Sequence, residues 1–289
     1  MSAQLALPPL EIRAFGRAEV RAGGVPVRWR SRSVRDLLFF LLAHPEGRPR
    51  EVVLATLWHL EPSASSLARL RLVLHRLRAV LGGPQAVVLD LEREQLSLSR
   101  AVLESSDVFA FHTALGETRR AEAGPTRAAH YRRALGLYAE FMAGEQAEWV
   151  CEARQVYQQL YVQAAVGLAL ELCRAEPEGS CDQMAQALMQ ALRQDPYLGE
   201  DYHQWLMRCL AQSEGVYAAI EHYRRLIHFL QAHLGDRPLE ETRDLAERIR
   251  GGEAVLCRPP EQRPHGIDCP LTLSGACQLW PEGGERDVS

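Results

Sequence analysis

Residues 66–81, SLARLRLVLHRLRAVL, combine apolar and basic side chains with the period of an α-helix. At about 100° per residue, five apolar side chains fall on one arc of such a helix. These are Leu70, Val73, Leu74, Leu77 and Leu81. The pattern therefore predicts an amphipathic helix that packs this arc against a hydrophobic core.

The opposite side of the predicted helix is a narrow ridge bordered by arginine. Its centre carries Ala68, Arg71, Leu72, His75 and Ala79, with Arg69 and Arg76 along one border and Arg71 and Arg78 along the other. Arginine can bind phosphates or guanine edges, and small apolar side chains can meet thymine methyl groups. The ridge suits the major groove of DNA. The alternative is a surface helix whose charged face is merely solvated, which is common.

The elements expected around this helix favour the DNA-binding interpretation. A helix is predicted over 51–58, and Pro62 with the neighbouring serines ends it and caps the basic helix. Gly82-Gly83 then ends the basic helix, and two strand-like runs follow at 86–90 and 95–99. Helix, break, basic helix and hairpin are the order of a winged helix-turn-helix.

The residues before these elements predict a small sheet and a buried helix. Strand-like runs lie at 10–16, 18–22 and 25–29, with Gly23-Gly24 as a turn. Residues 34–44, VRDLLFFLLAH, are apolar nearly all round and predict the buried central helix of this module.

From Asp107 to Gly251 the pattern becomes purely helical, with apolar residues three and four positions apart and breaks at glycine or proline. We expect antiparallel pairs of helices near 106–120, 126–139, 146–175, 181–194, 200–213, 216–233 and 238–250. The expected fold is mainly α with a small β component. Its predicted parts are a winged helix over 10–103, a helical domain over 104–251 and a tail over 252–289 whose proline, glycine and charge favour disorder.

The first hundred residues resemble the OmpR/PhoB-type winged helix at the front of the SARP family of bacterial regulators. The matching positions are Phe15-Gly16, the LLFFLLA run of 37–43, Trp58, Arg76-Leu77-Arg78 and Leu81. The resemblance implies a DNA-binding module. One departure is His59-Leu60, which replaces a short polar turn after Trp58 and bears on the shape of the loop that follows.

The helical region resembles the bacterial transcriptional activator domain that follows the winged helix in the same family, with helix pairs similar to tetratricopeptide repeats. The residues that carry this resemblance are Tyr138, Phe141, Trp149-Val150, Arg154, Asp195-Pro196, Tyr223 and Leu234-Gly235. A repeat surface of this kind can bind peptides, other protomers or small molecules, or serve packing alone. We expect Trp149 and Arg154 to anchor the chain internally.

Charge is distributed unevenly along the 289 residues. Up to Leu103 there are fifteen arginines and nine acids, a net charge of +6, and the remainder carries a net charge of −10, which together give −4. An acidic region is repelled by a polyanion, so binding to DNA is expected from the N-terminal part. The chain contains no lysine, which excludes a Walker A loop and a Schiff-base or pyridoxal-phosphate lysine. We expect neither an enzyme nor a cofactor.

The seven cysteines contain no CxxC pair, and four of them, Cys151, Cys173, Cys181 and Cys209, fall in helical patterns where a buried free thiol is expected. In the tail, Cys257, His265, Cys269 and Cys277 have spacings that match no common zinc site. His222, His228 and His233 lack the spacing of metal ligands and are expected at the surface. No bound metal is predicted.

No run approaches the roughly twenty apolar residues that cross a bilayer. The N-terminus also lacks a basic start and a cleavage-like site. The expected location is the cytoplasm, with no membrane partner.

These observations predict a sequence-specific DNA-binding transcriptional regulator, favoured to be an activator. In this hypothesis Arg71, Leu72, His75 and Arg76 face base edges, Arg69 and Arg78 hold phosphates, and the wing near Arg93 touches the minor groove. The expected partners are double-stranded DNA, a second copy of the chain on DNA and, as a further candidate, RNA polymerase. The alternative is a repeat-based adaptor whose winged helix contacts protein.

Overall fold

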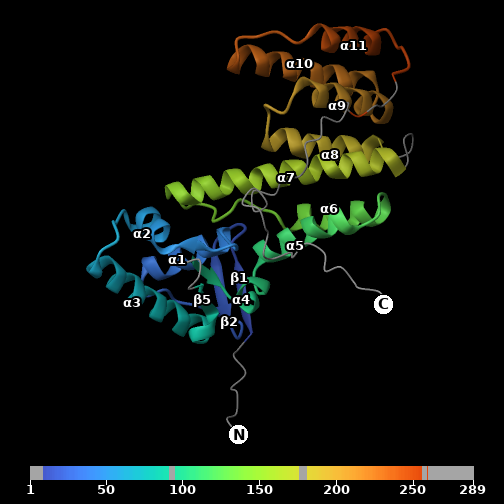
Figure 1. Cartoon of the computed structure of the whole chain (residues 1–289). Helices are drawn as coiled ribbons and strands as arrows, with labels where there is room; N and C mark the ends of the chain where they lie inside the picture. The colour runs from blue at the N-terminus through green and yellow to red at the C-terminus, as the bar shows by residue number, and fades with distance from the viewer. Residues whose placement is uncertain (1–8, 91–94, 176–180, 256–258, 260–289) are drawn as a thin grey trace, which may run out of the picture. The chain divides into compact units, whose positions relative to one another are not determined.

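The structure is a computed structural model, and it describes residues 9–90, 95–175, 181–255 and 259. The chain forms two compact units (Figure 1). Among the described residues, the N-terminal unit contains those up to Thr113 together with Leu137–Tyr157, and the helical unit contains Ala114–Gly136 and those from Gln158 onward. The mainly α fold with a small β component is confirmed.

The N-terminal unit begins with a three-stranded antiparallel sheet of β1 (Leu10–Arg13), β2 (Glu19–Ala22) and β3 (Val25–Pro26). Ile12 pairs with Val20, and both side chains are buried. Gly23 and Gly24 form the turn between β2 and β3 with φ angles of 59° and 78°, which glycine adopts without steric cost. The three expected strands are therefore present, each shorter than its sequence pattern.

β1 and the residues that follow it are bonded to two later segments of the same unit. The Ile12 N–H donates to the Ser105 carbonyl oxygen at 2.9 Å. Beyond the end of β1, the Met142 N–H donates to the Ala14 carbonyl oxygen at 2.7 Å, and the Gly16 N–H donates to the Glu140 carbonyl oxygen at 2.8 Å. The edge of the sheet is thus covered by residues far along the chain.

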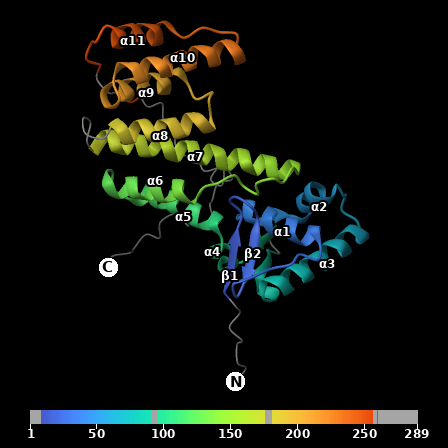
Figure 2. The ribbon, with the colours of Figure 1, turned by 180° about the vertical axis from the view of Figure 1, so that it is seen from behind.

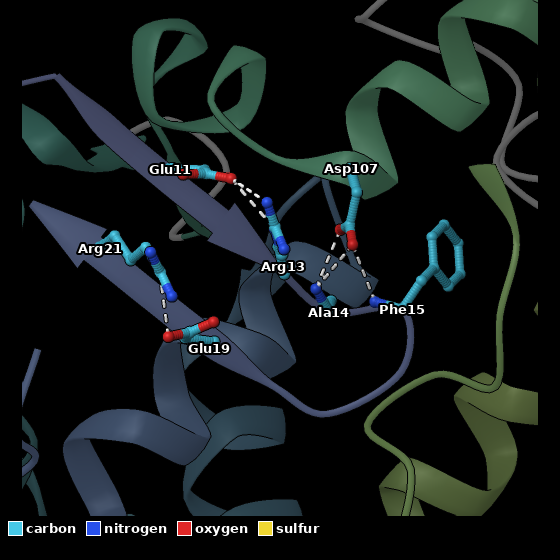
Figure 3. Close-up of polar contacts among 7 residues, drawn as sticks. All are labelled: Glu11, Arg13, Ala14, Phe15, Glu19, Arg21 and Asp107. Atoms are coloured by element: carbon cyan, nitrogen blue, oxygen red, sulfur yellow. Dashed lines mark hydrogen bonds and ion pairs between the residues drawn. The ribbon is translucent and has the colours of Figure 1, made fainter. Parts of the chain in front are cut away.

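Asp107 binds the same strand through its side chain (Figure 3). Its carboxylate accepts hydrogen bonds from the backbone N–H groups of Ala14, at 2.9 Å, and Phe15, at 3.0 Å. Burial raises the pKa of Asp107, and these backbone donors oppose that rise by stabilising the charged form. Figure 3 also shows that Arg13, which lies next to Ala14 in the chain, is paired with Glu11 at 2.6 Å.

Phe15 lies at the centre of an aromatic cluster in the N-terminal unit. Its ring is 5.4 Å from Phe111, 5.6 Å from Tyr138, 6.5 Å from Phe141 and 5.2 Å from Tyr157, measured between ring centroids. The edge-to-face geometry of most of these pairs is the favoured one for aromatic rings. Because the partners come from three segments of the same unit, around Phe111, Phe141 and Tyr157, this cluster fastens those segments to the residues that follow β1.

The helix-turn-helix and wing complete this unit. α1 (Arg32–Ala43) buries Val34 and residues 37–42, as expected for its central helix. It is followed by α2 (Arg50–Trp58), α3 (Ala64–Leu81), a short 3₁₀ turn η1 (Pro84–Ala86), and the hairpin of β5 (Val87–Asp90) and β6 (Gln95–Leu98). Two further elements were not predicted from the sequence. One is β4 (Arg48–Pro49), which pairs with β6 in the sheet order β4-β6-β5. The other is the short helix α4 (Arg100–Glu104).

The helices that follow match the expected ones closely. They are α5 (Asp107–Arg120), α6 (Pro125–Leu137), α7 (Glu148–Ala175), α8 (Cys181–Gln194), α9 (Glu200–Ser213), α10 (Val216–His233) and α11 (Glu240–Arg250). Within the helical unit α8 packs on α9, α9 on α10, and α11 on both α9 and α10. Figures 1 and 2 show these helices as successive layers.

The burial of three cysteines agrees with the sequence pattern where residues are described. Cys173, Cys181 and Cys209 are buried and Cys151 is half-buried, and none of the four is in a disulfide. No group of three possible metal ligands occurs among the described residues. The tail cysteines and His265 lie outside the described residues. Over the same described ranges, no helix has both the length and the apolar character to span a bilayer.

A pair of histidines joins α9 to α10, and it corrects one expectation. His203 Nδ1 lies 3.1 Å from His222 Nε2, and the two rings stack with an interplanar angle of 20°. Burial lowers the pKa of both, to about 3 for His222, where His203 and Arg225 add to the effect. His222 is therefore half-buried against His203 rather than fully exposed, whereas His228 is exposed as expected.

We expect the helical unit to lose stability as the pH falls from 7 to 5. Below about pH 6.5 the unfolded chain protonates a histidine that the folded chain keeps neutral. For His222 the difference amounts to about 2 kcal/mol at pH 5. Thermal unfolding at pH 7 and pH 5 measures the loss, which His222→Gln should reduce. His228→Gln is the control on the same helix, and equal pH dependence of the two variants would refute the assignment.

Candidate nucleic-acid interface

The N-terminus of α3 is fixed by serine caps. The Ser66 N–H donates to Ser63 Oγ at 3.1 Å, and the Ser63 N–H donates to Ser66 Oγ at 2.8 Å. The Ser66 hydroxyl also donates to the Glu61 carbonyl oxygen at 2.8 Å, which holds the loop before the helix. This reciprocal capping box confirms that the serines after Pro62 start the helix. At the other end, Gly82 closes α3 with a φ of 100°.

The two faces of α3 separate as the sequence pattern predicts. All five members of the apolar arc are buried: Leu70, Val73, Leu74, Leu77 and Leu81. On the opposite side the ridge is solvent-accessible, and Leu72 keeps 49% of its surface exposed. The exposed members of the predicted site are Arg69, Arg71, Leu72, His75 and Arg76, whereas Arg78 is half-buried. Arg93 lies outside the described residues.

Leu72 is one of several exposed apolar side chains of the protein, and single exposed leucines are common on protein surfaces. On a DNA-reading helix a side chain of this kind can meet a thymine methyl group.

Several cations of the N-terminal unit form ion pairs, and three exposed arginines of α3 do not. Arg21 pairs with Glu19 at 3.1 Å, Arg35 with Glu145 at 2.8 Å, Arg48 with Glu46 at 3.1 Å and Arg100 with Glu104 at 2.7 Å. Arg69, Arg71 and Arg76, by contrast, form no ion pair with any described residue, and residues 62–89 contain no acid at all. Their charge is thus available to an anionic partner.

Arg69 contacts α2, which the sequence pattern did not predict. Its guanidinium carbon lies 5.1 Å from the centroid of the Trp58 ring, within the range of a cation–π interaction. The missed contact depends on how α2 and α3 approach each other in space. No spacing rule along the sequence signals it.

The loop after Trp58 takes a defined shape despite the departure at His59-Leu60. His59 adopts the left-handed conformation, with a φ of 53°, and closes α2 where glycine is the usual residue. The Leu60 N–H donates to the Leu54 carbonyl oxygen at 3.2 Å, which completes the end of the helix. The turn is therefore made without glycine.

The wing hairpin lies next to α3 in the chain. In the pairing of β5 with β6, Val88 is opposite Ser97 and Asp90 is opposite Gln95. Residues 91–94 at its tip, which include the predicted minor-groove contact Arg93, lie outside the described residues. The hairpin that a winged helix requires is thus present in the expected place.

Trp149 and Arg154 act as internal anchors of the N-terminal unit. The Trp149 ring packs edge-on against Phe40 of α1, with 5.6 Å between centroids. Arg154 donates to the carbonyl oxygens of Phe141, at 2.8 Å, and of Met142, at 2.7 Å. These contacts occupy both side chains within the chain, as the sequence analysis expected.

Comparison with known proteins agrees with this organisation. The model of the family described as bacterial transcriptional activator domain matches residues 106–250, just over half of the chain. Among solved structures, the chain is similar to Mycobacterium tuberculosis EmbR in complex with a low affinity phosphopeptide. The TM-score is 0.63 at 18% sequence identity, over 86% of this chain and 67% of that one, which shows a shared fold. No curated protein sequence matches.

The order of elements along the chain agrees with the family match. Helix-turn-helix, wing and helical repeats follow one another along one chain, and the family match begins directly after the wing module. The chain belongs to the bacterial transcriptional activator domain family and is a SARP-type transcriptional regulator.

Proposed function

We propose that this regulator binds specific DNA sequences by placing α3 in the major groove. The observation that carries the proposal is the exposed outer face of α3. Its arginines at 69, 71 and 76 form no ion pair among the described residues, whereas cations of the same unit such as Arg21 and Arg100 are paired with glutamates. A cationic face without partners releases condensed counterions when it meets phosphate, which is the main source of protein–DNA affinity.

The proposed roles follow from position on the helix. Arg71, Leu72, His75 and Arg76 are exposed on the ridge and would face base edges, where a bidentate arginine contributes about 1 to 3 kcal/mol of discrimination. Arg69 on the border would hold a phosphate, and Arg78, which is half-buried, would do so with its outer end. Arg93 would reach the minor groove from the wing.

The output and the assembly are also part of the proposal. We infer transcriptional activation, because the family is named for that output. The helical unit would supply contacts to a second copy of the chain on DNA, with RNA polymerase as a further partner. Exposed apolar side chains in that unit, Tyr197, Tyr217, Leu234 and Leu239, are available for such contacts.

Selection of bound duplexes from a random pool tests this function. The full chain should enrich a defined sequence, and two copies of it spaced by about one helical turn of 10–10.5 base pairs would indicate paired protomers on one face of DNA. Arg76→Ala should blur the preference at one position of the enriched site. A pool that stays random after repeated selection would contradict sequence-specific binding.

A further inference from the structure

Arg69 is held differently from the other exposed arginines on α3. Its guanidinium lies over the ring of Trp58, the last residue of α2, at 5.1 Å from the ring centroid. No such aromatic contact is present at Arg71 or Arg76 among the described residues. One of the three exposed arginines is thus ordered in advance of any binding partner.

An aromatic partner orders an arginine without neutralising it. A carboxylate partner, such as Glu104 for Arg100 at 2.7 Å, cancels the charge that would attract phosphate. A ring that stacks on the flat face of the guanidinium leaves the N–H groups at its edge free to donate in the plane. The Trp58 contact therefore keeps Arg69 both charged and available.

The position of Trp58 is itself fixed by the loop between α2 and α3. The His59 N–H donates to the Ala55 carbonyl oxygen at 2.9 Å, which ends α2 directly after Trp58. The Ser66 hydroxyl, buried in α3, binds the Glu61 carbonyl oxygen at 2.8 Å. Both ends of the loop are thus tied to the helices that they join, and the indole is presented to α3 in a defined place.

We propose that Trp58 is a positioning residue that holds the Arg69 guanidinium in place for a DNA phosphate. The proposal rests on the proposed function, since it assigns a device within the same interface. Ordering a long side chain on binding reduces affinity by about three- to tenfold for each immobilised side chain. A guanidinium that is already stacked on an indole avoids most of that loss.

The test measures the affinity of the full chain for a random-sequence duplex of about 25 base pairs at fixed salt. Arg69→Lys keeps the charge but loses the planar stack, and it leaves the core untouched. It should weaken binding about three- to tenfold. The matched control is Arg100→Lys, because Arg100 lies over the Phe109 ring at the same 5.1 Å but is paired with Glu104. That control should leave the affinity unchanged.

A double-mutant cycle separates positioning from a structural role. Trp58→Leu should weaken the wild type about three- to tenfold but leave the affinity of Arg69→Ala unchanged, because there is then no guanidinium to position. Trp58→Phe, which retains an aromatic face, should restore most of the binding, and thermal unfolding checks that each variant folds. An equal loss from Trp58→Leu in both backgrounds, no loss, or tighter binding would overturn the proposal.

The outcome also distinguishes this inference from the function on which it rests. If the wild type binds duplex and Arg71→Ala weakens it, but Arg69→Lys binds as wild type does, the positioning role alone fails. If the wild type does not bind duplex at any salt concentration, the proposed function fails and the positioning role with it.

Discussion

Replacing Phe15 with alanine should lower the free energy of unfolding of the N-terminal unit by about 3 to 5 kcal/mol. The ring is only 8% exposed and contacts four aromatic side chains at centroid distances of 5.2 to 6.5 Å. Its removal leaves a cavity that rigid neighbouring rings cannot fill. Denaturation in urea, followed by tryptophan fluorescence, measures the change.

Val25→Ala on β3 is the control for the Phe15 experiment. Val25 lies in the same sheet but is 67% exposed, so its truncation should change the free energy of unfolding by less than about 0.5 kcal/mol. If the Phe15→Ala protein were as stable as the Val25→Ala protein, the aromatic cluster would not hold the segments around Phe111, Phe141 and Tyr157 to the residues that follow β1.

The second large effect concerns DNA affinity. The double variant Arg71→Ala, Arg76→Ala should bind random duplex on the order of fiftyfold more weakly than the wild type at about 0.1 M salt. A random duplex lacks the bases that these two side chains are proposed to read, so both would contact phosphates there, and the variant loses two counterion-releasing contacts. Both side chains are exposed, so stability should change by less than about 0.5 kcal/mol. Fluorescence anisotropy with a labelled duplex gives the affinity, and thermal unfolding confirms the fold.

Arg100→Ala supplies the comparison for this double variant. It removes a cation of the same unit that is already paired with Glu104, so its effect on duplex affinity should be small. If Arg100→Ala and the double variant weakened binding to the same extent, the loss would reflect overall charge rather than an interface on α3.

Periodicity was sufficient to predict most of the fold. The apolar arc of 66–81 identified the buried side of α3, and the same kind of pattern located the helices from α5 to α11 within a few residues. Periodicity could not predict the pairings between distant segments. β4 was missed because it is only two residues long and contains a proline. The bond from Asp107 to Ala14 was missed because the two residues are more than ninety positions apart in the sequence.

For the candidate site, the sequence predicted which side chains of α3 are exposed but not all of their contacts. The exposure of Arg69, Arg71, Leu72, His75 and Arg76 followed from their angular positions on one helix. The stacking of Arg69 on Trp58 did not, because it depends on the loop that joins two helices. The contact of His222 could not be predicted for the same reason, since its partner His203 lies on another helix and the two rings meet only when α9 packs on α10.

The salt dependence of duplex binding shows whether the outer face of α3 contacts DNA. If the outer face of α3 is a DNA interface, the logarithm of the wild-type affinity for random duplex should fall linearly with the logarithm of salt concentration. On random duplex, where Arg71 and Arg76 meet no matching bases, both would contact phosphates instead. The slope should therefore become shallower by about 1.8 in the Arg71→Ala, Arg76→Ala protein, about 0.9 for each lost phosphate contact. An adaptor whose winged helix contacts protein would show almost no duplex binding at low salt and no change of slope, and that result would contradict the account.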